Sequence, residues 1–405
     1  MSRLLEDASK KLLSQFRIPV PRGKVVATPE EARQAAQELG GAVALKALVP
    51  VGKRGKAGAV RFAASPEAAA AAAQELLKMK VYHFPVEKIL VEERVNIARE
   101  IYACVTYDPL KKMPVVIASS QGGVDVEEVA ATYPEKVVTK QVDPYLGLAN
   151  YQAKEIWCDL GLKGDELRVA TDILWRMYQC FEKYDATIVE VNPLAVTGDG
   201  KGVAAGVLMA VDDDALYRHP DLASVIQPGS DRAWRPLTDI EKYIIQVDAE
   251  DPYRGTARYT ELEGGDIGFL CGGGGGSLLM FDTLRKYGGR PANYTEFGGN
   301  PPERKMYGLT KGILSKPGLK GFFLSINITN NTQVDLVAEG LLRALKDMNI
   351  DVKEFPIVIR MAGVNEPRAK ELLEGAGVPY HGDDITMEDA ARMMVERMRQ
   401  AHPSY

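Results

Sequence analysis

A group of cations and glycines follows a short apolar segment near the N-terminus. Lys46 lies near the end of AVALKAL, and Lys53, Arg54 and Lys56 follow in a loop with Gly55 and two further glycines. Glycine lets backbone N–H groups approach phosphate oxygens closely, while the cations neutralise the charge of those oxygens. The spacing differs from that of the Walker loop, G-x-x-x-x-G-K-[ST]. The stretch therefore indicates either a polyphosphate site or a solvated basic hairpin.

Oxygen ligands form a second candidate group. Glu190 and Asn192 are two residues apart in IVEVNPL, so on a strand both side chains lie on one face. Such hard oxygen ligands suit Mg²⁺, which binds nucleotide phosphates through few protein groups. Glu92, near the end of KILVEERV, and Glu100 are further acids of this kind. An ordinary strand edge with an exposed glutamate and asparagine has the same pattern, so both interpretations stay open.

The elements that must position these residues alternate between helix and strand. Residues 1–16 have the pattern of an amphipathic helix, because their leucines recur on one helical face. Thr28 before Pro29, and Ser65 before Pro66, are signals for a helix start. We expect further helices at 29–39, 66–80 and 164–184, and strands at 42–48, 88–95, 101–107, 113–120 and 186–197.

The second half of the chain is organised differently. Residues 221–262 are rich in turn formers and indicate a connector, partly helical at TDIEKYIIQVD. Beyond them, strands such as DIGFLCG, GFFLSI and FPIVIRMAG alternate with helices expected at 277–287, 302–315, 333–347 and 366–376. This alternation is typical of a parallel, doubly wound α/β sheet. We therefore expect one domain over 1–220 and a second domain over 263–405.

Composition limits the partners and the compartment. The 405 residues carry a net charge of −5, which argues against nucleic acid or an anionic membrane as a partner. No apolar run reaches the length of about 18 residues that marks a membrane-spanning helix. Cys104, Cys158, Cys180 and Cys271 have no C-x-x-C spacing, so neither a disulfide framework nor a zinc site is expected. These features favour a cytoplasmic protein.

Five ordered motifs resemble those of the ATP-grasp subunit of succinyl-CoA synthetase. They are Lys46 with GKRGKAG, then VEERVNIARE, SSQGGVDVEEVA, DPYLGLANYQAKEI and VEVNPL. The likeness continues through GDIGFLCGGGGGSLLMFDTLRKYGGRPANYTEFGG, so it covers nearly the whole chain. It implies an α/β protein with an N-terminal ATP-grasp fold and a C-terminal flavodoxin-like CoA-ligase domain. It also implies ATP or GTP as the nucleotide, together with Mg²⁺.

The resemblance assigns roles to residues of the first half. It places nucleotide contacts at Lys46, Lys53, Arg54, Gly55, Glu92, Val95 and Glu100, with Glu92 and Val95 in the hinge that reads adenine and ribose. Asn192 matches a Mg²⁺ ligand. Glu190 matches the catalytic acid beside a phosphohistidine and is a second candidate for the metal. Phosphoryl transfer depends mainly on positioned cations and a metal ion, which agrees with this set.

One metal ligand of the family is missing. An ungapped alignment places Gly206 where the family has a second metal-binding aspartate, and glycine has no side chain that could bind a metal. Three alternatives stay open. Glu190 and Asn192 hold Mg²⁺ with additional waters, or an aspartate from 212–214 takes the missing place, or nucleotide turnover is impaired. Gln121 likewise stands where the family usually has glutamate.

The loops expected to bind the acid differ from those of succinyl-CoA synthetases. Five glycines at 272–276 and the segment NITNNTQVD resemble instead ATP-citrate lyase and citryl-CoA synthetase. This second resemblance implies that the acid contacts Asn330, Thr332, Arg360 and the backbone amides of Gly272, Gly274, Gly275 and Gly276. The N-terminus of the helix after the glycines would receive a carboxylate. However, Met361 replaces the second of two arginines of the citrate enzymes, which removes a bidentate contact. Succinate and citrate, a small di- or tricarboxylate, both remain candidates.

The phosphorylated histidine of the family has no counterpart in this chain. His83, His219, His381 and His402 all lie outside a Gly-Ala-rich loop, and we expect all four at the surface. The resemblance therefore implies a partner, a CoA-binding subunit that carries the phosphohistidine. The first hypothesis is the nucleotide-binding subunit of an ADP-forming carboxylate–CoA ligase. The second is a catalytically impaired regulatory or scaffold paralogue that binds nucleotide or the partner subunit without turnover.

Overall fold

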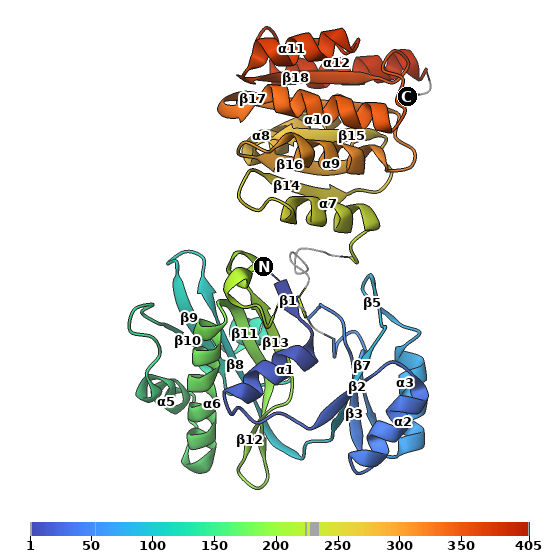
Figure 1. Ribbon diagram of the computed structural model, residues 1–405. Helices are drawn as coiled ribbons and strands as arrows, with labels where there is room; N and C mark the ends of the chain where they lie inside the picture. The colour runs from blue at the N-terminus through green and yellow to red at the C-terminus, as the bar shows by residue number, and fades with distance from the viewer. Residues whose placement is uncertain (1, 53, 223–224, 227–234, 404) are drawn as a thin grey trace. The chain divides into compact units, whose positions relative to one another are not determined.

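The chain folds as two compact units. A computed structural model describes residues 2–52, 54–222, 225–226, 235–403 and 405. The first unit is Met1–Pro236 and the second is Leu237–Tyr405. The described residues of the first unit form a seven-stranded, a four-stranded and a two-stranded sheet, and those of the second unit form one six-stranded sheet (Figure 1). Each unit has its own buried hydrophobic clusters. Within the described residues, no helix combines the length and the apolar character needed to cross a membrane.

The smaller part of the first unit is an antiparallel sheet of four strands covered by two helices. Its order is β2-β7-β3-β4. The strands are β2 (Gly23–Val26), β7 (Ile89–Glu93), β3 (Val43–Ala47) and β4 (Val60–Ala63). The helices α2 (Pro29–Glu38) and α3 (Pro66–Leu76) begin where the sequence predicts, because the side chains of Thr28 and Ser65 cap them. Their buried faces consist largely of alanine, which lets both helices lie close to the sheet.

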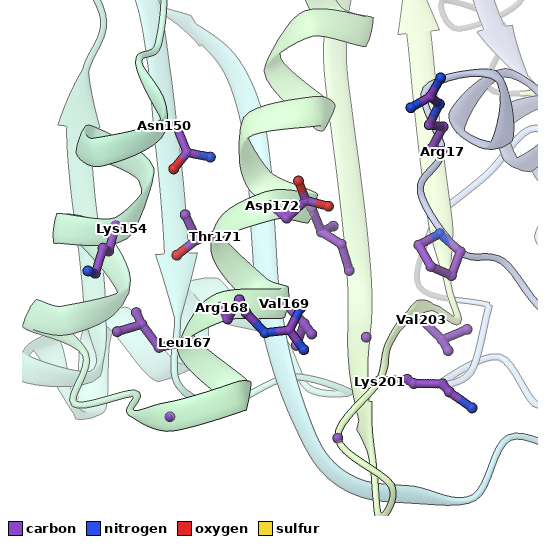
Figure 2. Close-up of a pocket in the computed structure, with 15 residues that line it drawn as sticks. Arg17, Asn150, Lys154, Leu167, Arg168, Val169, Thr171, Asp172, Lys201 and Val203 are labelled. Carbon is purple, nitrogen blue, oxygen red and sulfur yellow. The ribbon is translucent and has the colours of Figure 1, made fainter.

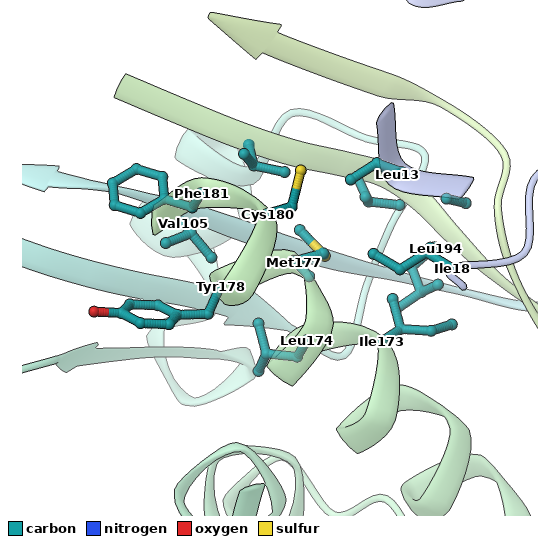
Figure 3. Close-up of a cluster of buried hydrophobic side chains, with 14 of the residues drawn as sticks. Leu13, Ile18, Val105, Ile173, Leu174, Met177, Tyr178, Cys180, Phe181 and Leu194 are labelled. Atoms are coloured by element: carbon teal, nitrogen blue, oxygen red, sulfur yellow. The ribbon is translucent and has the colours of Figure 1, made fainter. Parts of the chain in front are cut away.

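The larger part of the first unit is built on a second sheet, with the order β1-β13-β11-β8-β9-β10 and β12 paired with β11. Its strands are β1 (Ser2–Leu4), β8 (Ile97–Asp108), β9 (Met113–Ser119), β10 (Val137–Gln141), β11 (Ala186–Thr197), β12 (Gly202–Ala204) and β13 (Val207–Val211). The helices α5 (Asn150–Asp159) and α6 (Gly164–Lys183) share a hydrophobic cluster with its strands. Figure 3 shows Ile173, Met177 and Phe181 of α6 in one buried cluster with Leu13 and Val105. Short elements complete the unit, namely β5 (Lys80–Val81), β6 (Phe84–Pro85), α4 (Val126–Thr132), η1 (Pro134–Lys136) and η2 (Asp213–Arg218).

The N-terminus differs from the single helix expected over 1–16. Residues Ser2–Leu4 form strand β1, and the helix α1 spans Glu6–Gln15. Strand β1 pairs antiparallel with β13, with Ser2 opposite Val211 and Leu4 opposite Met209. The helical pattern of the leucines does not reveal this pairing, because the backbone hydrogen bonds of a sheet depend on a distant strand. The pairing fixes where α1 begins.

The second unit has a six-stranded sheet with the order β14-β16-β15-β17-β18-β19. Strands β15 (Ile267–Gly272), β16 (Asn293–Gly298), β17 (Gly321–Gln333), β18 (Ile357–Val364) and β19 (Tyr380–His381) are parallel, and β14 (Thr256–Glu261) is an antiparallel edge strand. Numbered along the chain, the parallel strands have the order 2-1-3-4-5 of the flavodoxin-like fold. This agrees with the predicted doubly wound sheet.

Helices cover both faces of this sheet. The helices α8 (Gly274–Lys286) and α12 (Met387–Ala401) share one hydrophobic cluster. The helices α7 (Asp239–Ala249), α9 (Glu303–Leu314), α10 (Val334–Asp347) and α11 (Glu366–Gly375) contribute to a second cluster. The first and last helices of the alternating pattern therefore lie together, as a doubly wound topology requires.

The predicted connector at 221–262 is divided differently in the structure. The boundary between the units follows Pro236, and both α7 and β14 belong to the second unit. The reason is a buried lysine, Lys305 of α9, whose side chain is 1% exposed. Its Nζ lies 2.9 Å from Asp248 Oδ1 and donates to the carbonyl oxygens of Asp251 and Gly255 at 2.7 and 2.8 Å. The end of α7 and the start of β14 are thus held to α9.

We predict that Lys305→Met destabilises the second unit. The change leaves two carbonyl oxygens and the Asp248 carboxylate without their cation, which should lower the free energy of unfolding by about 2–4 kcal/mol. Urea denaturation of the full chain measures this. Lys311→Met on the same helix is the control, because Lys311 donates to the Tyr307 hydroxyl and lies over the Tyr307 ring. Equal stability of the two variants would contradict the role given to Lys305.

Candidate functional site

Three cations and two carboxylates meet in the interior of the first unit. Lys46 Nζ lies 3.0 Å from Glu6 Oε1 and 2.8 Å from Glu92 Oε2. Lys10 Nζ lies 2.8 Å from Glu6 Oε1 and 2.5 Å from Glu92 Oε1. Arg54 completes the group, since its Nη2 donates to Glu6 Oε2 at 2.5 Å. We call these five residues the buried charge cluster.

The cluster is assembled from four parts of the chain. Glu6 and Lys10 lie one turn apart on α1, Lys46 lies on β3, Glu92 lies on the neighbouring β7, and Arg54 follows in the glycine loop. Its members are not equally accessible. The side chains of Glu6, Glu92 and Lys10 are 1%, 2% and 5% exposed, whereas those of Lys46 and Arg54 are 13% and 15% exposed. A ligand would therefore reach Lys46 and Arg54 first.

Burial and charge act against each other on these groups. Burial alone would raise the pKa of Glu6, but the charges of Lys46, Arg54 and Lys10 outweigh it and hold the pKa far below its usual value. Burial likewise opposes the charged form of Lys46, yet the carboxylates of Glu6 and Glu92 raise its pKa. For Lys10, burial prevails and, with the charge of Lys46, lowers the pKa below the usual value.

A single backbone segment links this cluster to the larger sheet. Both Lys46 Nζ and Lys10 Nζ donate to the carbonyl oxygen of Ala205, at 2.5 and 2.7 Å. The next carbonyl oxygen, that of Gly206, accepts a hydrogen bond from Asn192 N at 2.8 Å. The predicted phosphate contacts and the predicted metal ligand therefore meet at two adjacent residues. This convergence could not be read from the sequence, where they are 146 positions apart.

The face shared by β8 and β11 carries Glu190. Its Oε2 accepts a hydrogen bond from the Tyr102 hydroxyl at 3.2 Å, and Cys104 lies opposite it in the register. Burial raises the pKa of Glu190, although the Tyr102 hydrogen bond and the charge of Arg3 oppose this. Burial together with the Glu190 charge raises the pKa of the Cys104 thiol to about 12, so this thiol stays protonated. The hydrogen bond from the neutral Tyr102 hydroxyl thus holds the Glu190 carboxylate in place.

The glycines of SSQGGVDVEEVA bring Glu100 and Asn192 together. Gly123 N donates to Asn192 Oδ1 at 2.7 Å, and Asn192 Nδ2 donates to the carbonyl oxygen of Val124 at 3.1 Å. A Cβ on Gly123, whose φ is +69°, would lie 2.1 Å from Glu100 Oε2. A larger residue at this position would displace the Glu100 carboxylate and would be strained by the left-handed backbone.

Gly206 is tightly enclosed. A Cβ at this position would lie 2.1 Å from the carbonyl oxygen of Asn192, so the structure leaves no room for the aspartate of the family. The alternative that Asp212, Asp213 or Asp214 takes its place is wrong. These residues follow the far end of β13, about 20 Å from Gly206 along an extended strand. Asp213 also accepts a hydrogen bond from Ser2, and Asp212 caps the backbone of Asp214.

The donors for a metal ion are therefore few. In the described part of the chain, no group of three or more His, Cys, Asp or Glu side chains could hold a metal ion. Asn192 Oδ1 and the Glu190 carboxylate remain as neighbouring oxygen donors. This sparse set fits Mg²⁺, which keeps several waters and binds mainly to substrate phosphates. It does not fit a metal held by the protein alone.

The second unit has a cavity at the carboxyl ends of its central strands. The volume is about 170 Å³, and its lining consists of glycines and neutral side chains. It is lined by Gly272, Gly273, Phe297, Gly298, Gly299, Ile326, Asn327, Thr329, Asn331 and Thr332. The helices after β15 and β17 lie on opposite faces of the sheet, so the cavity is at the topological switch point where α/β folds bind ligands.

The glycine run begins α8 beside this cavity. Gly273 has φ +86° and caps the helix, so the N–H groups of Gly274, Gly275 and Gly276 are those that a helix leaves without partners within it. Only Gly272 and Gly273 line the cavity. Glu296 lies close to the helix start, and its Oε2 accepts hydrogen bonds from Tyr294 and Ser277 at 3.3 Å each. The first turn of α8 therefore has an acid beside it.

A larger cavity of about 830 Å³ lies elsewhere in the first unit (Figure 2). Residues of α5, α6 and the segment around β12 line it, together with Arg17 and Pro19. None of the predicted site residues is among its lining residues. The described cations of this cavity, such as Arg17, Lys154 and Lys201, are exposed at the surface. Volume alone is thus a poor guide to the site in this unit.

Comparison with known proteins decides the family. Residues 3–196 match the model of the ATP-grasp domain, and residues 235–392 match that of the ATP citrate lyase citrate-binding domain. The GDP-forming succinate–CoA ligase subunit beta of Thermus thermophilus is 39% identical over 393 residues, covering 97% of this chain and 98% of its own. The ADP-forming subunit beta of Rubrobacter xylanophilus is 37% identical over 402 residues, covering 98% of each chain.

The chain belongs to the succinate–CoA ligase β-subunit family. Its members are acid–thiol ligases with an ATP-grasp domain. Among solved structures, ATP citrate lyase of Methanothrix soehngenii in complex with citrate and coenzyme A superposes with a TM-score of 0.80 at 21% identity. That match covers 98% of this chain and all of the other. It confirms the predicted succession of an ATP-grasp fold and a doubly wound domain.

Most of the predicted nucleotide and metal residues lie in the buried charge cluster or on the adjoining sheet. Lys46, Arg54 and Glu92 lie in the buried charge cluster, and Glu190, Asn192 and Glu100 lie on the adjoining sheet. The Glu92 carboxylate is occupied by two lysines, so the structure gives it a role in holding cations. Val95 lies half-buried between β7 and β8, and Gly55 lies in the loop beside Arg54. Lys53 lies outside the described residues.

Three predictions disagree with the structure. Arg360 is 4% exposed, and its guanidinium donates to the carbonyl oxygens of Ile326 and Ile385, so it supports the sheet and does not line the cavity. Asn330 is exposed and lies outside the cavity lining, whereas Thr332 is within it. His219 is 7% exposed, because its ring packs against Tyr184 and its Nε2 lies 2.6 Å from Asp185 Oδ2. The expectation of a surface residue is wrong for His219.

Sequence reasoning missed Glu6 and Lys10 in the first unit, and Asn327, Thr329 and Asn331 in the second. Glu6 and Lys10 have a spacing of i, i+4 on an amphipathic helix, which is the available signal. Nothing in the sequence distinguishes Lys10 from the adjacent exposed Lys11. Asn327 and Asn331 belong to the segment NITNNTQVD, in which three asparagines are close together.

We predict that a side chain at Gly206 destabilises the protein whatever its chemistry. Gly206→Ala and Gly206→Asp should lower the free energy of unfolding by a similar amount, about 1–3 kcal/mol, because the clash already arises at Cβ. Urea denaturation of both variants measures this. Gly198→Ala is a matched control, because a Cβ there meets nothing within 4 Å. If Gly206→Asp were as stable as wild type, the close approach of Asn192 would be refuted.

Proposed function

We propose that this chain is the nucleotide-binding subunit of a heteromeric ADP- or GDP-forming ligase that joins a small dicarboxylate to coenzyme A. The observation that carries the proposal is the meeting of Lys46 and Asn192 at the Ala205–Gly206 segment, with Arg54 joined to Lys46 through the Glu6 carboxylate. Two cations and an oxygen donor in a partly accessible position suit a nucleotide polyphosphate. The relatives that match nearly the full length of the chain are named succinate–CoA ligase subunits.

The first unit would bind the nucleotide and position its phosphates. Lys46 and Arg54 face the terminal phosphates, where they would neutralise charge that develops during phosphoryl transfer. Mg²⁺, when bound beside Asn192 and Glu190, would supply further positive charge to the phosphate oxygens. None of the described residues named above for this site would act as a nucleophile. Its residues would act by orientation and charge alone.

The second unit would receive the acid in the cavity at its switch point. The amide and hydroxyl groups of Asn327, Asn331, Thr329 and Thr332 offer hydrogen bonds, but no described cation lines the cavity. A small dicarboxylate such as succinate needs fewer charged contacts than citrate, and Arg360 is committed to backbone oxygens. These features favour succinate over citrate as the acid.

A partner would carry the phosphate between the two sites. The reaction proposed for the pair moves the terminal phosphate of ATP to a histidine, then to the acid to form an acyl phosphate, which the thiol of coenzyme A attacks with release of phosphate. All four histidines of this chain are described, and none lies in the buried charge cluster or lines the cavity of the second unit. A CoA-binding subunit with the phosphohistidine is therefore part of the proposal, as is a cytoplasmic location.

The nucleotide assignment can be tested with the CoA-binding subunit of the same genome. Lys46→Met should abolish the transfer of labelled γ-phosphate from ATP to that subunit, because it removes the more central of the two accessible cations. Autoradiography of the separated subunits measures this. Lys56→Met, on the exposed end of the same loop, is the control and should keep the label. Persistence of the label in Lys46→Met would refute the nucleotide site.

The acid assignment can be tested by a pair of neighbouring asparagines. Asn331→Ala should raise the KM for succinate about tenfold while leaving that for ATP unchanged, because Asn331 lines the cavity. Asn330→Ala is the matched control and should change neither. Steady-state kinetics of the reconstituted pair with succinate, citrate and malate measure this. An effect of Asn330→Ala that exceeds that of Asn331→Ala would contradict the cavity as the acid site.

One observation favours a second candidate function, a paralogue that binds nucleotide or the partner without turnover. Gly206 leaves the metal with fewer ligands than the family pattern requires. Reconstitution separates the two candidates. ADP binding with no acid-dependent ADP release, for any of the three acids, would support the paralogue. CoA-dependent release with one of them would support the ligase.

A further inference from the structure

The buried charge cluster does not balance its charges internally. Among the residues that the structure describes, it contains three cations, Lys10, Lys46 and Arg54, and two carboxylates, Glu6 and Glu92. All five side chains are at most 15% exposed, so water screens them poorly. Folded proteins rarely bury an excess charge without a partner. The imbalance therefore points to an anion that completes the cluster.

The position of each cation shows which one creates the excess. Lys46 and Arg54 are the outer cations, and with Glu6 and Glu92 alone they would form a neutral group of two pairs. Lys10 is the least exposed of the three cations, at 5%, and it contacts the same two carboxylates as Lys46 does. Because Lys10 contacts Glu6 Oε1 and Glu92 Oε1, part of the negative charge of these carboxylates neutralises Lys10. That part is then not available to neutralise Lys46 and Arg54.

We propose that Lys10 is a positioning residue that sets the positive charge of the phosphate site without touching the nucleotide. It occupies both carboxylates from within, so that the outer Lys46 and Arg54 keep a net positive charge toward a phosphate. Helix α1 thereby becomes part of the nucleotide site, together with strand β1 that fixes its start. This inference rests on the proposed function and adds to it a residue that the family motifs do not identify.

The geometry also explains why Glu6 accompanies Lys10. Glu6 is the only carboxylate of the cluster that contacts all three cations. Removal of its charge would restore the excess that removal of Lys10 abolishes. Lys10→Met leaves two cations and two carboxylates, whereas Lys10→Met with Glu6→Gln leaves two cations and one carboxylate. The single excess charge of the wild type is thus present in the double variant and absent in the single one.

The experiment is isothermal titration calorimetry of the purified full chain with ADP and Mg²⁺. Lys10→Met should weaken ADP binding about tenfold or more, as expected for loss of a unit charge at short range in a poorly screened site. The double variant should regain ADP affinity to within about threefold of wild type. Adenosine has no phosphate, so its affinity should be the same in all variants. Lys11→Met, one residue along α1 and exposed, is the matched control and should bind ADP as the wild type does.

The ADP affinities of these variants distinguish the proposed role of Lys10 from a purely structural one. A Lys10→Met chain that binds ADP like the wild type, or a double variant that is no better than Lys10→Met, would overturn the inference. A purely structural role of Lys10 predicts that the double variant is worse than either single one. If Lys10→Met does not fold, as judged by circular dichroism, Lys10→Arg and Lys10→Gln replace it, and only the charged arginine should retain affinity. A wild type that binds no ADP would instead overturn the proposed function itself.

Discussion

The structure of the first unit depends on the burial of unequal charge. Burial of an ion pair costs desolvation free energy, which the attraction between the partners offsets only when their geometry is good. Removal of one partner leaves the other charge buried without compensation. Here the five charged groups come from α1, β3, β7 and the glycine loop, so none of these parts can shift without disturbing the others. The same charges hold the two sheets of the unit to one another through the Ala205 carbonyl oxygen. Fold and ligand affinity thus share one set of contacts.

The two units solve the problem of anion binding in different ways. The first concentrates side-chain cations in a poorly screened interior. The cavity proposed for the acid in the second is lined by glycines and by neutral amide and hydroxyl side chains at the end of a parallel sheet. A polyphosphate carries several negative charges, so its attraction to buried cations can offset the free-energy cost of burying them. A small carboxylate can be held by hydrogen bonds. The difference in polarity between the sites matches the difference in charge between their proposed ligands.

The fold could be predicted from the sequence further than the sites could. Strand and helix patterns placed β3, β8, β9, β11 and the parallel strands β15, β17 and β18 of the second unit, because apolar periodicity and proline or serine starts are local signals. The two-residue strand β19 was not predicted. Strands β1 and β14 were not predicted, since their pairing with β13 and β16 depends on distant residues. The connector was extended too far for the same reason.

For the site residues, too, local motifs could be predicted, whereas burial and contacts with distant residues could not. Lys46, Arg54 and Asn192 follow from family motifs, and the structure brings them together. The burial of Lys10 and of Arg360 could not be inferred, because the sequence does not show whether a charged side chain faces solvent or buried oxygen atoms. Asn330 and Asn331 are adjacent in the chain, and only the backbone path of the loop determines which of them lines the cavity.

The contact between Gly206 and the Asn192 carbonyl has a consequence for how the metal site can change over time. A mutation that introduces a carboxylate at this position cannot by itself add a ligand, because the backbone of β11 occupies the space first. The carbonyl group of Asn192 would have to move before an acid could be accommodated. A second change, in the backbone of β11, must therefore accompany the substitution before a carboxylate at position 206 can serve as a ligand.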